Sequence, residues 1–230
     1  MKKCTFATMA VFVSLLGSAS LPSYAHEAGD WIIRVGATSV EPDESSSLIS
    51  TTATGPLANT GAGVGNSTQL GLNVVYMMSD NLGIELLAAT PFEHDLDAQG
   101  LSDYGFQTTD LGSAKHLPPT LTAEYFLFDS SSAFRPYLGI GINYTTFFSE
   151  DLSGFAKSEL DARSLDLDDS WGVAWRAGFD WDLNDSWMFN MSAWKIDLET
   201  DASFDSALGK VKAKVDVDPW VYMISLGYKF

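Results

Sequence analysis

Residues 220–230 read WVYMISLGYKF, and this stretch decides the fold. Large apolar side chains occupy every second position from Trp220 to Phe230, while smaller or polar residues stand at several of the positions between them. An alternation with a period of two is typical of a β-strand whose two faces meet different surroundings. Because the apolar face is aromatic at both ends, we predict a lipid-facing strand with an aromatic girdle at each interface. The alternative is the edge strand of a soluble protein.

The same alternation recurs seven times upstream. The predicted strands span about residues 31–40, 68–78, 82–89, 120–128, 138–144, 171–181 and 187–193. Three short polar turns and four long connections join them, and short periplasmic turns with long extracellular loops characterise outer-membrane barrels. We therefore predict an all-β fold, an eight-stranded antiparallel transmembrane β-barrel with periplasmic termini and four long extracellular loops. A soluble, lipocalin-like barrel would instead bury its aromatic side chains.

The N-terminus carries the features of a secretory signal peptide. Lys2 and Lys3 precede an apolar run over residues 6–16, and Ser23-Tyr24-Ala25 is a small-x-small cleavage signal. The apolar run is shorter than the roughly 20 residues that a membrane-spanning helix needs. We predict that residues 1–25 are cleaved and that residues 26–230 form the barrel. The single cysteine, Cys4, lies in the removed segment, which excludes thiol chemistry and disulfides in the mature chain.

The charge of the chain argues against one class of partner. The formal net charge is −17, and removing the two lysines of the signal peptide lowers it to −19. Nucleic acid would be repelled by such a chain. The chain is also rich in Trp, Phe and Tyr, although no long apolar run follows the signal peptide. This combination is typical of a β-barrel.

Two kinds of residue fall on the inward face of the predicted strands. The charged ones are Arg34, Glu85, Glu124, Arg176 and Asp180. Buried charges are costly unless they are paired, so we expect ion pairs that plug the lumen. The alternative is conduction of protons or ions along them.

The second kind is apolar. These inward residues are Leu87, Phe126, Phe128, Met188, Trp194, Ile196 and Met223. A water-filled lumen would not select such side chains. They predict an apolar compartment that accepts a small hydrophobic molecule, with ordinary core packing as the alternative.

Several segments resemble the OmpW family of outer-membrane proteins. They are residues 66–72, 80–92, 116–120, 134–137, 141–148, 169–172, 190–192, 218–221 and 227–230. The resemblance implies a narrow hydrophobic channel that is closed toward the periplasm and releases small hydrophobic compounds sideways into the membrane. It also implies that Leu87 and Trp194 constrict this channel. The final Phe230 resembles the terminal signature that the barrel-assembly machinery reads.

These observations lead to a functional prediction with alternatives. We predict a cell outer-membrane barrel, a monomer in lipid and lipopolysaccharide, that takes up small hydrophobic molecules passively. The alternative is a structural or recognition barrel with a packed, non-conducting interior, whose loops bind partners. The carboxylates of residues 149–169 fit no EF-hand, so we expect a solvated acidic surface there.

An enzyme is the remaining hypothesis. His94 and His116, with Asp95 and Ser113 nearby in sequence, offer the residue types that hydrolytic catalysis requires. Histidines in polar loops are usually solvated, so we expect both to lie on the surface. We therefore predict no catalytic residues, no metal and no cofactor.

Overall fold

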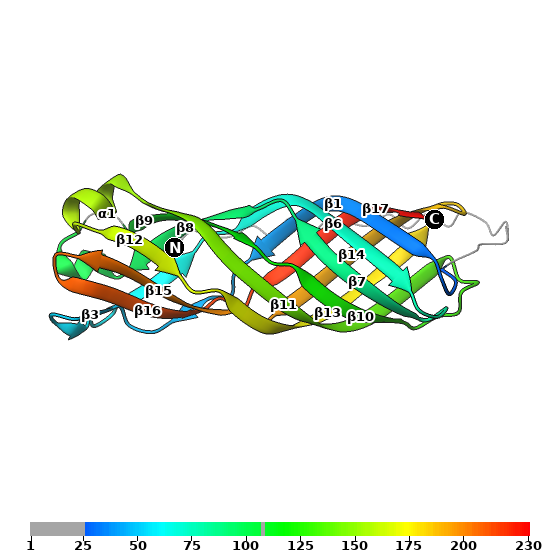
Figure 1. Cartoon of the computed structure of the whole chain (residues 1–230), viewed down its shortest axis with the longest axis horizontal. Helices are drawn as coiled ribbons and strands as arrows, with labels where there is room; N and C mark the ends of the chain where they lie inside the picture. Colours follow the sequence, from blue (N-terminus) through cyan, green and yellow to red (C-terminus); the bar gives the residue numbers. More distant parts are fainter. Residues whose placement is uncertain (1–25, 107–108) are drawn as a thin grey trace, which may run out of the picture.

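Eight long antiparallel strands close on themselves as a barrel in the computed structural model, which describes residues 26–106 and 109–230 (Figure 1). The barrel strands are β1 (Trp31–Glu41), β6 (Ser67–Met77), β7 (Leu82–Ala89), β10 (Thr120–Phe126), β11 (Phe134–Leu152), β13 (Ser170–Asp182), β14 (Trp187–Ile196) and β17 (Trp220–Lys229). The pairing of β1 with β17 and of β10 with β11 completes the ring. The predicted eight-stranded antiparallel barrel is confirmed.

The outer wall of the barrel is apolar, as the alternation predicts. Exposed side chains from neighbouring strands form it, among them Leu70, Leu86, Leu121, Leu138, Ile140, Ile142, Trp175 and Ile224. Such a continuous apolar surface fits lipid and would be an aggregation liability in water. Aromatic pairs, including Trp187 with Tyr228 and Trp220 with Tyr222, lie toward its two ends.

The fourth strand is shorter than predicted. It ends at Phe126, and the side chain of Asn81 donates hydrogen bonds to the carbonyl oxygens of Phe126 and Phe128. Arg135 also binds the Phe128 carbonyl, so the chain turns out of the barrel at this point. The prediction that Phe128 faces inward is wrong, because its side chain is 48% exposed.

The four long connections are built largely of further strands, which extend the molecule beyond the barrel (left in Figure 1). One sheet continues from the upper half of β11 through β9 (Asp110–Leu117), β8 (Phe92–Gln99) and β5 (Gly61–Val64). A second sheet contains β12 (Arg163–Leu167), β15 (Glu199–Ser206), β16 (Gly209–Asp216), β3 (Ser50–Thr51) and β4 (Gly55–Pro56), and β2 (Ser45–Ser46) pairs with β16. We call these two sheets the extension.

Two short helical segments complete the extension. They are α1 (Gly154–Glu159) and a 3₁₀ turn at Leu101–Tyr104. Among the described residues, no helix is long and apolar enough to cross a membrane. The predicted signal peptide, residues 1–25, lies outside the described residues.

Candidate functional site

A buried network of charges crosses the middle of the barrel lumen. Arg34 donates to Glu85 at 2.8 Å and to Asp180 at 2.6 Å, and Arg176 pairs with both Glu85 and Glu124. Each of the five side chains is at most 3% exposed. The structure thus places all five predicted lumen charges in one network, which we call the charged layer.

Neutral polar residues complete the charged layer, and sequence reasoning missed them. Asn73 donates to Glu85 at 2.9 Å, and Asn190 donates to Asp180 at 2.7 Å. The Tyr137 hydroxyl accepts hydrogen bonds from Arg176 and from Asn190. His26, which precedes the first strand, lies 2.8 Å from Asp180. The two asparagines and Tyr137 occupy inward positions of the strand alternation, so sequence analysis could have identified them. His26 precedes the first strand, so no alternation indicates its position.

Apolar clusters lie on both sides of the charged layer along the strands. The lower cluster, toward the short turns, contains Ile32, Val75, Met77, Phe126, Tyr137 and Met188. The upper cluster contains Val40, Leu87, Phe92, Ala174, Trp194, Ile196, Leu198, Val215, Val217, Val221 and Met223. The Arg176 guanidinium lies 4.3 Å from the Trp194 ring, so the charged layer and the upper cluster are in direct contact. The lumen is therefore packed across the membrane-spanning part.

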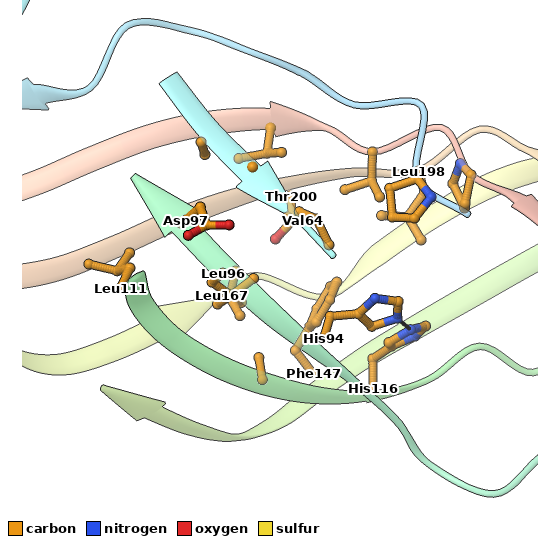
Figure 2. A pocket seen from close by; sticks show the side chains of 18 of the residues that line it. Val64, His94, Leu96, Asp97, Leu111, His116, Phe147, Leu167, Leu198 and Thr200 are labelled. Atoms are coloured by element: carbon orange, nitrogen blue, oxygen red, sulfur yellow. Dashed lines mark hydrogen bonds between the residues drawn. The ribbon is translucent and has the colours of Figure 1, made fainter. Parts of the chain in front are cut away.

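An open pocket lies above the upper cluster, between the two sheets of the extension (Figure 2). Its volume is about 70 Å³. The apolar side chains that line it include Val40, Val64, Leu96, Leu111, Phe147, Leu165, Leu167, Leu198, Val215 and Val217. Val40, Leu198, Val215 and Val217 also belong to the upper cluster, so the pocket and the cluster form one continuous apolar region.

The structure separates the six residues that were predicted to line a channel. Leu87, Trp194, Ile196 and Met223 belong to the upper cluster and form the packed layer beneath the pocket. Phe126 and Met188 lie on the other side of the charged layer, in the lower cluster. None of these six residues is among the described residues that line the open pocket.

His94 and His116 lie at the wall of the pocket, and the prediction that they are solvated is wrong. They are 5% and 7% exposed, and their Nε2 atoms are 2.9 Å apart (Figure 2). His116 stacks on Phe92 with 5.4 Å between ring centroids. Burial lowers the pKa of both histidines, and burial together with His94 lowers the pKa of His116 to about 3. Both side chains therefore stay neutral at physiological pH.

The surroundings of the two histidines give no support to a catalytic role. Within the described residues, their ring nitrogens meet each other and the Gly65 carbonyl oxygen. Asp95 and Ser113 are paired across β8 and β9 one position beyond His94, on the side away from His116, and Asp95 is exposed on the opposite face. No group of three or more His, Cys, Asp or Glu side chains suited to a metal ion occurs in residues 26–106 or 109–230.

A period-two signal for strands of the extension is present in the sequence. Phe92 and His94 are buried, and they alternate with the exposed Glu93 and Asp95 along β8. Val211 and Val215 are likewise buried in β16, where they alternate with charged residues. This alternation identifies strands in the long connections, but it does not show which strands face each other.

Comparisons with known proteins agree with this architecture. A model of the OmpW family matches residues 27–230. The chain is 44% identical to outer membrane protein W of Escherichia coli strain K12, and the match covers 100% of both chains. It is 46% identical to outer membrane protein OprG of Pseudomonas aeruginosa, whose crystal structure superimposes with a TM-score of 0.85 over 90% of this chain and 99% of that chain.

A more distant relative carries an informative name. The chain is 28% identical to the dibenzothiophene metabolism operon protein PahQ of Pseudomonas aeruginosa, over 91% of this chain and 92% of the relative. The chain belongs to the OmpW family and is a non-enzymatic barrel of the cell outer membrane.

Proposed function

We propose that this barrel binds small hydrophobic molecules at the cell surface and mediates their passive uptake. The observation that carries the proposal is the apolar pocket of the extension, which continues into the upper cluster of the barrel. Apolar surface is transferred favourably from water into such surroundings. The name of the relative PahQ supports the proposal, since dibenzothiophene is an apolar aromatic compound.

The packed lumen bears on the route that a bound molecule takes. Beneath the pocket, the upper cluster, the charged layer and the lower cluster follow one another along the strands. An apolar molecule would have to displace paired charges to reach the periplasmic end, which is costly. We therefore propose that it leaves sideways into the membrane. The same packing favours the non-conducting interior of the alternative function, a recognition barrel, so binding has to be tested directly.

A pocket-filling substitution tests the proposal. Ala202 lines the pocket, whereas Ala207 is exposed in the turn of the same β15–β16 hairpin. We expect Ala202→Phe to weaken binding of a fluorescent hydrophobic probe, such as N-phenyl-1-naphthylamine, by about tenfold or more, because its ring occupies the cavity. Ala207→Phe is the matched control and should bind like the wild type. Binding is measured with the protein in lipid vesicles, against vesicles without protein.

The predicted constriction is tested in the same assay. If the upper cluster is the onward path, Leu87→Ala and Trp194→Ala will change the rate of probe uptake into vesicles while pocket binding persists. Equal probe binding by the wild type and Ala202→Phe would overturn the proposal. If uptake is unchanged in both Leu87→Ala and Trp194→Ala, these residues serve packing alone.

A further inference from the structure

The hydrogen-bond chain at the pocket wall has a defined direction. Gly65 offers a carbonyl oxygen, which can only accept, so the Nδ1 of His94 must carry the proton and donate to it. The Nε2 of His94 is then an acceptor, and it faces the Nε2 of His116 at 2.9 Å. His116 must therefore carry its proton on Nε2, which leaves its Nδ1 as a lone-pair acceptor.

That acceptor is unsatisfied. Within residues 26–106 and 109–230, the Nδ1 of His116 is buried and has no hydrogen-bond partner. The ring lines the pocket, and its neighbours include Phe92 and Phe147, with ring centroids 5.4 Å and 5.8 Å away. Leaving a buried acceptor unpaired costs free energy. A single water molecule there would lack the about three hydrogen bonds that buried waters typically make.

We propose that the pocket selects small molecules with an apolar body and one hydroxyl group, alcohols or phenols, over hydrocarbons and ethers of the same size. The hydroxyl donates its hydrogen bond to the Nδ1 of His116, while the apolar body fills the space between the two sheets. This inference rests on the proposed function and names its ligand class. The acceptor remains available at and above mildly acidic pH, because burial keeps the pKa of His116 low.

A pair of isomers isolates the hydrogen bond. 1-Hexanol and 1-methoxypentane have the same atoms, but the ether has no hydrogen-bond donor. Each competes with the fluorescent probe for the wild-type protein in lipid vesicles, and each concentration is corrected for partition into vesicles without protein. We expect the alcohol to displace the probe at a corrected concentration about tenfold lower than that of the ether, because one additional hydrogen bond can strengthen binding by this factor.

Two variants separate this inference from the proposed function. The double variant His94→Phe/His116→Phe removes the ring nitrogens of both pocket histidines while retaining two flat rings. It should lose the preference for the alcohol but still bind the ether. The folding of the double variant is checked by heat-modifiable gel mobility. The comparison of the alcohol with the ether on the wild-type protein does not depend on any variant. Ala202→Phe should weaken binding of both isomers.

Each outcome decides something. Equal displacement by the alcohol and the ether in the wild type, with both weakened by Ala202→Phe, overturns the inference and leaves the proposed function standing. A preference that persists in the double variant also overturns the role of His116. Displacement that is unaffected by Ala202→Phe overturns both proposals.

Discussion

The barrel and the extension are built from the same kind of strand but distribute their residues in opposite ways. The barrel encloses Arg34, Glu85 and Asp180 and presents apolar side chains outward. The extension encloses apolar side chains and presents lysines and carboxylates outward, as the exposed ion pair of Lys214 with Glu199 illustrates. Outward composition therefore follows the solvent, lipid for the barrel and water for the extension.

The inward face is continuous between the two regions. Along β11, the buried Tyr137, Asn143 and Thr145 precede Phe147, which lines the pocket. On this strand, the inward side chains thus change from polar to apolar as the strand leaves the barrel.

The largest effect is expected from breaking the charged layer. Arg34→Met leaves Glu85 and Asp180 buried without their shared partner. Removing one member of a buried ion pair typically costs about 3–5 kcal/mol, because an uncompensated charge remains. We expect a loss of this size in the free energy of unfolding, measured by urea titration in lipid vesicles with tryptophan fluorescence.

The extension supplies the contrasting control. The Lys214 and Glu199 side chains are 2.7 Å apart but about half exposed. Water and salt screen an exposed pair, so Lys214→Met should change the free energy of unfolding little. Equal losses in Arg34→Met and Lys214→Met would contradict the distinction between the two regions.

The sequence predicts correctly those features that depend on the alternation within a single strand. Each barrel strand shows its own alternation, so the ring of eight strands and the inward position of the five charges follow from local parity. The strand end at Phe126 depends on a hydrogen bond from Asn81, 45 positions away, and the turn after it on a hydrogen bond from Arg135 to the Phe128 carbonyl. Parity therefore misplaced Phe128.

The pocket could not be predicted in this way. The pocket requires β8 and β9 of one sheet to face β12, β15 and β16 of the other. An alternation with a period of two does not show which sheets face each other. Parity also cannot tell a lining residue from a packed one. Leu87 and Trp194 are inward as predicted, but they are packed beneath the open space.

A smaller effect is expected from acid, and it should be confined to the extension. Burial lowers the pKa of His116 to about 3, and that of His94 is also lowered, against about 6.5 in an unfolded chain. Below about pH 6.5 the unfolded segment takes up protons that the folded one resists, so stability falls as the pH drops toward 3. The slope is at most about 1.4 kcal/mol per pH unit for each histidine.

Amide hydrogen exchange, corrected for its intrinsic pH dependence, measures this effect. Between pH 7.5 and 5.5, protection should fall in β8 and β9 while β1 and β17 keep theirs. The double variant His94→Phe/His116→Phe should remove the slope. A parallel loss of protection in barrel and extension would argue against a local cause.

The most direct test of the central claim is to locate a bound hydrophobic molecule. A small photoreactive diazirine hydrocarbon is added to the protein in lipid vesicles, and the labelled residues are mapped by mass spectrometry. The expected result is labelling of pocket residues such as Val64, Leu96 and Val217, lost in Ala202→Phe and retained in Ala207→Phe. Labelling confined to the lipid-facing wall, and unchanged in Ala202→Phe, would contradict a binding site in the extension.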